Sequence, residues 1–362
     1  MVEQAPPAAS RRSPARLAIQ VVVSLLLVVV IFYFLLKKVD LGQAWTAITD
    51  MTWLELTTLG LLAVWNLCTY AFVWMSVTPG LSFWHAMVMT QSATAVTNTV
   101  PWAGPGIGVG MTYNMLGGWG YSRSRTTTAV LVSGVWNAFV KLGMPVLALA
   151  LVALQGNATG GRVIAALLGI GGLVAAVVVF ALMLRSEQVA HRVGELAGQA
   201  ASRVLRLVRR PPVAGWELAT VKFRSRTIAL VEHRWIAITV TSLVSHLSLY
   251  LVLLVALRDV GVSDAEVSWA QVLVAFAFGR LITAIPYTPG GLGAVEVTLI
   301  ATLAAAGGDR AQVAAAVLVY RALTWGLPIL VGVATYLWWR RRSLTAPAHD
   351  RAPTVDSQRP TR

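Results

Sequence analysis

The sequence predicts an all-α polytopic membrane protein with about six full spans and two re-entrant broken-helix hairpins in an inverted repeat. Hydrophobic residues make up 57% of the 362 residues and charged residues only 12%, which is about half the charged share of a soluble domain. The apolar runs extend along the whole chain, and proline and glycine interrupt two of them. We therefore expect one membrane domain over residues 17–340, between a cytoplasmic tail at 1–16 and a disordered cytoplasmic tail at 341–362.

Uninterrupted apolar runs of about 20 residues, the length that a helix needs to cross a bilayer, predict the full spans. The first run is followed by Lys37 and Lys38 and not by a small-residue cleavage site, so we interpret it as a retained span and not as a signal peptide. The predicted spans are 17–36, 53–76, 128–154, 163–184, 236–257 and 312–338.

Two apolar stretches, 83–118 and 269–306, are broken by proline and glycine near their middle. Each has an apolar arm, a Pro/Gly-rich apex and a second arm. Unpaired backbone groups are tolerated at membrane depth only where they line a protein cavity. The pattern therefore predicts two hairpins that each enter and leave on one face, with their apices at a site.

Basic residues are distributed unevenly between the predicted loops. With the N-terminus inside, 21 lysines and arginines fall in inner segments and 5 in outer segments. Polytopic proteins concentrate these residues in cytoplasmic loops. The bias predicts that the N-terminus, the 185–235 loop and the C-terminus are cytoplasmic, and it accounts for the net charge of +14 without a nucleic-acid partner.

The basic loop 185–235 alternates apolar and basic residues at helical spacing up to Pro211 and Pro212, which would end a helix. Such a helix suits the anionic surface of the inner leaflet. A solvated cytoplasmic helix is the alternative that the pattern leaves open.

The two apices align with one another at a fixed offset, residues 101–111 over 286–296. The helices that follow also share a Gly-x-Pro pattern, at Gly143 and Pro145 and at Gly326 and Pro328. Three predicted spans separate the hairpins, and an odd number inverts the second copy. The halves 17–154 and 163–340 are therefore expected to form an inverted repeat, an architecture of transporters.

Four ionisable residues lie within predicted membrane elements: Lys141, Arg280, Glu296 and Arg321. Arg280 and Glu296 flank the second apex at similar distances, so we expect them to pair. The remaining positive charge is costly in a membrane interior and points to an anionic ligand, for which a lipid phosphate is the nearest source.

The apices supply the rest of the predicted binding site, because glycine lets a ligand approach the backbone closely and lets the hairpins move. The expected apex residues are Pro101, Gly106, Gly108, Pro289, Gly290, Gly291 and Gly293.

Other chemistries lack the residues that they need. A lone cysteine, Cys68, and five scattered histidines predict neither a disulfide nor a metal site. No GxxxxGK[ST] motif indicates ATP-driven transport, and the glycine string at 104–110 has no strand–helix context for a dinucleotide. We expect no cofactor and no enzymatic activity.

The segment PGGLGAVE at 289–296, with Arg280 upstream, resembles the transmembrane domain family of the lysylphosphatidylglycerol synthase/flippases. The resemblance extends over about residues 17–340. It implies a bacterial inner-membrane protein that moves lipid between leaflets. The soluble aminoacyltransferase domain of the full synthases is expected to be absent.

We therefore expect translocation of an anionic phospholipid or lipid-linked intermediate, with Lys141, Arg280 and Arg321 at the headgroup and Glu296 orienting Arg280 or carrying a proton. One alternative is a secondary transporter of a small anionic solute. Another is a non-transporting scaffold for a lipid- or glycan-modifying enzyme. The expected partners are an anionic membrane lipid and the inner-leaflet surface, and a homo-oligomer is left open.

Overall fold

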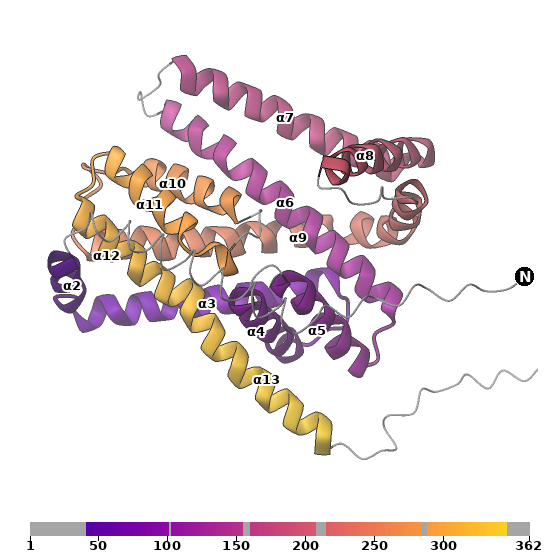
Figure 1. The fold of residues 1–362 in the computed structure, drawn as a ribbon, viewed down its shortest axis with the longest axis horizontal. Helices are drawn as coiled ribbons and strands as arrows, with labels where there is room; N and C mark the ends of the chain where they lie inside the picture. Colours follow the sequence, from indigo (N-terminus) through magenta and orange to yellow (C-terminus); the bar gives the residue numbers. More distant parts are fainter. Residues whose placement is uncertain (1–40, 101–102, 155–159, 208–214, 284–287, 346–362) are drawn as a thin grey trace, which may run out of the picture.

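The computed structural model describes residues 41–100, 103–154, 160–207, 215–283 and 288–345, which contain helices and no strand. The predicted all-α class is therefore confirmed for this part of the chain (Figure 1). In chain order, the elements are α2 (Leu41–Thr49), α3 (Trp53–Val77), α4 (Phe83–Thr99), α5 (Gly104–Gly118), α6 (Arg123–Leu154), α7 (Gly160–Arg185), α8 (Glu187–Leu207), α9 (Trp216–Asp259), α10 (Trp269–Ile282), the 3-10 turn η1 (Pro289–Gly291), α11 (Ala294–Ala305), α12 (Arg310–Arg321), the π-helical turn η2 (Ala322–Gly326) and α13 (Leu327–Thr345).

Among the described residues, five candidate membrane spans meet the length and hydropathy that a crossing helix needs. They lie in α3, α6, α7, α9 and the continuous stretch from α12 to α13. Each overlaps a predicted span, so a multi-pass membrane protein is confirmed. The predicted first span, 17–36, lies outside the described residues, as does the tail from residue 346 onward.

Helix ends follow the local chemistry of the sequence. The Thr52 hydroxyl accepts from the Glu55 amide at the start of α3, and the Glu55 carboxylate accepts from the Thr52 amide. Ser268 forms the same capping box with Gln271 before α10. Asp309 accepts from two amides at the start of α12. Each cap satisfies amides that a helix leaves unpaired in its first turn.

The structure corrects two predicted boundaries and adds one helix. α9 begins at Trp216, twenty residues before the predicted span 236–257, because no glycine or proline lies between 216 and 259 to end the helix. α13 continues to Thr345, so residues 341–345 are helical and not part of a disordered tail. α2 was not predicted; Ala44 anchors it, at 2% exposure, in the main hydrophobic cluster.

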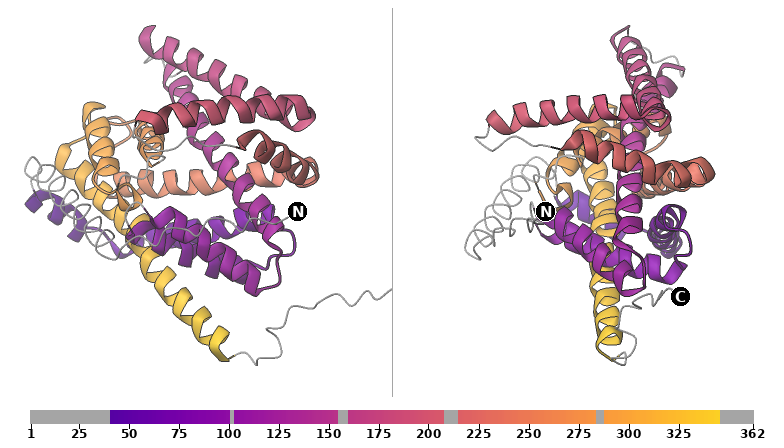
Figure 2. Two further views of the ribbon diagram at one scale, coloured as in Figure 1. Left: turned by 45° about the vertical axis from the view of Figure 1, so that its right-hand side comes forward. Right: turned by 90° about the vertical axis from the view of Figure 1, so that its right-hand side faces the viewer.

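The main hydrophobic core joins α9, α10, α11 and α12, where Leu253, Phe276, Leu303 and Val317 are buried. α3 packs along α9, α4 along α13, and α10 along α6 and α11. α7 is mostly exposed and lies at the edge of the molecule, opposite the end of α13 (Figure 2). Exposed leucines and valines on α7 suit contact with lipid.

α8 packs against the N-terminal part of α9. Its buried face consists of the small residues Ala190, Gly194, Gly198 and Ser202, and a Cβ atom on Gly194 would come within 2.7 Å of the α9 backbone. Leu196 on another face is exposed. The basic loop is therefore a helical layer that packs on α9, a contact that neither of the two predicted alternatives included.

Candidate functional site

The Gly-rich apex of the second helix pair forms a tight turn between α10 and α11. Gly290 and Gly291 have φ values of +59° and +73°, in the left-handed region where a side chain is strained. A Cβ atom on Gly290 would lie 2.6 Å from the Trp325 ring. Gly293 precedes α11, and its amide donates to Oε2 of Glu296 at 2.7 Å. The sequence of this segment therefore brings the backbone of η1 against η2.

Glu296 pairs with Arg321 and not with Arg280. The Glu296 side chain is 1% exposed, and its Oε1 accepts from Nε of Arg321 at 2.6 Å. Nη2 of Arg321 donates to the Gly290 carbonyl at 3.1 Å. The expected Arg280–Glu296 pair is wrong, because α12 packs on α11 and holds Arg321 beside the capping position of Glu296. This network links η1, α11 and α12.

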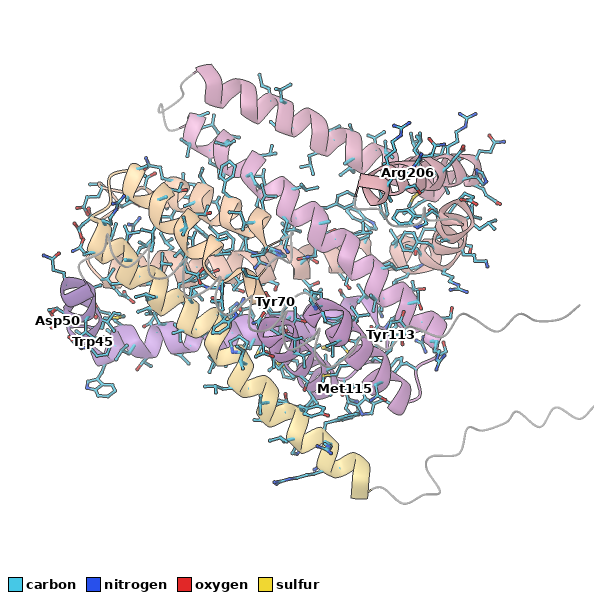
Figure 3. All side chains as sticks on the ribbon, in the orientation of Figure 1. Trp45, Asp50, Tyr70, Tyr113, Met115 and Arg206 are labelled. Carbon is cyan, nitrogen blue, oxygen red and sulfur yellow. The ribbon has the colours of Figure 1, made fainter. Side chains whose placement is uncertain are left out.

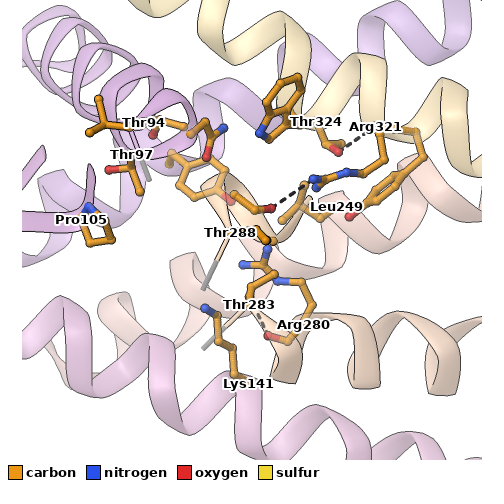
Figure 4. Close-up of a pocket in the computed structure, with 17 residues that line it drawn as sticks. Thr94, Thr97, Pro105, Lys141, Leu249, Arg280, Thr283, Thr288, Arg321 and Thr324 are labelled. Carbon is orange, nitrogen blue, oxygen red and sulfur yellow. Dashed lines mark hydrogen bonds between the residues drawn. The ribbon is translucent and has the colours of Figure 1, made fainter. Parts of the chain in front are cut away.

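Lys141 and Arg280 have no carboxylate partner in the part of the chain that the structure describes. Within the described ranges, neither side chain forms an ion pair, and Nε of Arg280 is buried without a hydrogen-bond partner. Lys141 comes from α6 and Arg280 from α10, two helices that pack together. Both side chains reach the same cavity as Arg321 (Figure 4).

The cavity has a volume of about 240 Å³. Besides the three cations, it is lined by residues from both apices and from α3, α4, α9 and the α12–η2 turn. Two of its neutral donors, Thr288 Oγ1 and Trp325 Nε1, are also buried without a partner in the described part of the chain. The other lining residues are Tyr70, Thr94, Thr97, Asn98, Val100, Pro105, Leu249, Thr283, Gly290, Gly291, Tyr320 and Thr324.

Unpaired buried donors cost free energy unless a ligand or water accepts their hydrogen bonds. Here the unpaired groups are the Nε–H of Arg280, a hydroxyl and an indole N–H, and the side chain of Lys141, which forms no ion pair within the described residues, lines the same cavity. They come from helices that the sequence places far apart. The arrangement suits an acceptor-rich anion of the size of a phosphate group.

The predicted site residues divide into three groups. Lys141, Arg280 and Arg321 line the cavity, together with Gly290 and Gly291. Glu296 and Gly293 hold the turn behind it. Pro289 begins η1.

The first apex contributes differently from the prediction. Gly106 faces open space, and Gly108 lets α5 approach Ala93 and Thr97 of α4; neither lines the cavity. Pro105 does line it and was not predicted. Pro101 lies outside the described residues.

Some lining residues could have been found from helical spacing. Thr324 and Trp325 follow Arg321 by three and four residues and so lie near it on one side of the helix. Thr94, Thr97 and Asn98 share one face of α4 before the first apex in the same way, whereas no local pattern marks Tyr70.

A protein-family model described as "Lysylphosphatidylglycerol synthase TM region" matches residues 21–332. The match covers nearly the whole chain and includes every residue that lines the cavity. A search of curated proteins found no match.

Proposed function

Because this chain belongs to the family of lysylphosphatidylglycerol synthase transmembrane regions, we propose that it moves an anionic phospholipid or an anionic lipid-linked intermediate between the leaflets of a membrane. The headgroup phosphate would bind in the central cavity, between Lys141 and Arg280. Trp325 and Thr288 would donate hydrogen bonds to it.

The excess of positive charge in the cavity carries the proposal. Glu296 balances Arg321, which leaves Lys141 and Arg280 without a carboxylate in the described part of the chain. A cation at the centre of a bilayer costs about 2.5–3.5 kcal/mol on insertion scales. A phosphate that carries negative charge into the cavity offsets this cost, whereas a zwitterionic headgroup brings a second cation with it.

In this proposal, the lipid headgroup crosses the membrane between two helix pairs, α4–α5 and α10–α11. α4–α5 and α10–α11 act as re-entrant hairpins from opposite faces, related as an inverted repeat, and their apices meet at the cavity. Val100 and Pro105 of the first apex line it together with Thr288 and Gly290 of the second, which supports the pairing of the apices. A movement of one pair against the other would expose the cavity to each leaflet in turn.

Translocation by the purified protein in vesicles tests the proposal. Fluorescent phosphatidylglycerol and phosphatidylcholine are incorporated separately, and chemical reduction of the outer-leaflet label measures the fraction that crosses. We expect phosphatidylglycerol to cross faster with protein than without it, and faster than phosphatidylcholine.

The same vesicles separate the alternatives. Uptake of a soluble organic phosphate with no lipid movement would favour a transporter of small anionic solutes. If neither lipid nor solute crosses, the proposal fails and the result favours a role as a non-transporting scaffold.

A further inference from the structure

A second cavity, lined by apolar and basic side chains, lies about 20 Å from the central one along α6 and α9 and shares no residue with it. Its volume is about 380 Å³, and it is formed where α3 ends, α6 begins and the N-terminal half of α9 passes between them. Its walls combine basic, hydroxyl and apolar side chains: Val77, Thr78, Pro79, Ser124, Arg125, Thr128, Arg226, Ala229, Leu230, His233 and Arg234.

The charge of this cavity has one sign. Among the described residues, three arginines line it, Arg125, Arg226 and Arg234, which we call the inner arginine cluster, and no carboxylate does. Arg226 and Arg234 are eight residues apart on α9, so they lie on the same face of the helix. Within the described ranges neither of them forms an ion pair. All three arginines are exposed at this open cavity, and their like charges attract an anion to it.

Arg125 is held in place at the rim of the cavity. Its Nη2 donates to the Pro79 carbonyl at 3.2 Å, and its guanidinium lies 5.4 Å from the centre of the Tyr121 ring. A guanidinium has five donors, and these contacts leave most of them available. These two contacts orient the guanidinium of Arg125 toward the end of α3.

Thr78 adds an unpaired neutral donor. Its side chain is 3% exposed, and Oγ1 has no hydrogen-bond partner in the part of the chain that the structure describes. A buried hydroxyl without a partner costs roughly 1–3 kcal/mol. Like the donors of the central cavity, it lies beside cations that lack a counter-ion.

Helix geometry gives the distance between the two cavities. Thr128 and Lys141 on α6 are thirteen residues apart, and Arg234 and Leu249 on α9 are fifteen apart, which corresponds to about 20 Å and about 22 Å at 1.5 Å per residue. The hydrocarbon core of a bilayer is about 30 Å thick. A central cavity near mid-membrane therefore places the second cavity at the level of the headgroups. Trp235, next to Arg234, is 53% exposed, as suits an interfacial tryptophan.

We propose that the inner arginine cluster binds the phosphate of an anionic phospholipid in the inner leaflet, as a site distinct from the central cavity. Guanidinium groups match phosphate oxygens with paired, charge-assisted hydrogen bonds. Leu230 lines the same cavity and would offer the lipid apolar surface beside its headgroup. Binding here does not require translocation, and the position of the site suits the loading of lipid toward the central cavity along α6 and α9.

Lipid binding to the full chain in detergent tests the site. Short-chain phosphatidylglycerol is titrated against Lys141→Ala/Arg280→Ala protein, so that the signal reports the second site, and the measurement is repeated with Arg226→Ala/Arg234→Ala added. We expect the added pair to weaken binding at least about tenfold, because two charge-assisted contacts to phosphate are lost. Thr78→Val keeps the shape of the side chain, removes its hydroxyl and should weaken binding by a smaller factor.

The matched control is Arg192→Ala/Arg203→Ala, which removes the same charge from exposed positions on α8. If the control weakens binding as much as Arg226→Ala/Arg234→Ala, general surface charge explains the effect and the site is wrong. Glycerol 3-phosphate serves as the competitor. Full displacement at equal concentrations would show a site for a soluble phosphate and overturn the lipid assignment.

These results are independent of transport. Intact lipid binding at the cluster in a protein that moves no lipid would contradict the proposed function and leave this site standing. If the parent transports phosphatidylglycerol and Arg226→Ala/Arg234→Ala does not change lipid binding, the proposed function stands and this second site is wrong.

Discussion

Glu296 links the turn and the helix that surround the central cavity. It accepts from the Gly293 amide and from Arg321, so one carboxylate satisfies both the start of α11 and a buried cation. The residue types were predictable, because charged side chains in apolar sequence are rare and are seldom placed there without a function. The partner of Glu296 was not predictable from the sequence, because it depends on how α12 packs against α11 and on the direction of the Arg321 side chain.

The pairing of Glu296 with Arg321 predicts coupled effects on stability. Glu296→Gln should destabilise the protein by roughly 3–5 kcal/mol, because it leaves a largely buried guanidinium without its counter-ion. Glu296→Ala/Arg321→Ala should cost clearly less than the two single changes added together. Unfolding in mixed detergent micelles measures each free energy.

The matched cycle pairs Glu296 with Arg280 in place of Arg321, because Arg280 lines the same cavity and forms no ion pair with Glu296 in the described part of the chain. Glu296→Ala/Arg280→Ala should be close to additive. Additive effects in the first cycle and coupling in the second would contradict the observed pairing.

At the scale of elements, hydropathy predicts the apolar part of a helix better than its ends. The basic residues in the polar half of α9 favour a loop by hydropathy, although nothing in its sequence stops a helix. The buried glycines of α8 explain the close packing of that helix on α9. The sequence alone does not predict this contact, because it does not show which helix packs against those glycines. The π-helical turn η2 follows Arg321 and has no sequence signature of its own.

The geometry of the turn η1 predicts that substitution by alanine has very different effects at Gly290 and at Gly106. Gly290→Ala places a methyl group against Trp325 and imposes a positive φ on alanine, which costs about 1–2 kcal/mol before any clash. We expect lower thermal stability and slower lipid movement. Gly106→Ala, in helix α5 with open space around it, should leave both unchanged or raise stability slightly. Equal effects at the two positions would show that the turn has no special role.

For the whole molecule, charge is separated along the long axis. Asp50 and Arg206 lie at opposite ends in Figure 3. Asp50, Glu55, Asp259 and Asp309 line one cavity at the α2 end, whereas the inner arginine cluster and α8 lie toward the other. The excess of basic residues in predicted inner segments could be counted from the sequence. The convergence of three distant basic residues on one cavity needed the packed helices.

This separation predicts the orientation in the membrane. In a Cys68→Ala background, Gln199→Cys on α8 should resist a membrane-impermeant thiol reagent in intact cells, because the basic end faces the cytoplasm. Ala265→Cys, exposed between α9 and α10, should react. Reaction at residue 199 together with protection at residue 265 would show that the topology is the reverse of the one predicted here.

The central claim is that Lys141 and Arg280 hold the headgroup phosphate of a lipid while it crosses the membrane. The most direct measurement compares phosphatidylglycerol translocation by the parent and by Lys141→Ala/Arg280→Ala in vesicles, with Arg192→Ala/Arg203→Ala as the charge-matched control. We predict that the cavity variant folds and moves phosphatidylglycerol at least about tenfold more slowly, since each lost contact to phosphate contributes on the order of 1.5–3 kcal/mol, while the control keeps the parent rate. A folded cavity variant that moves the lipid as fast as the parent would contradict the account.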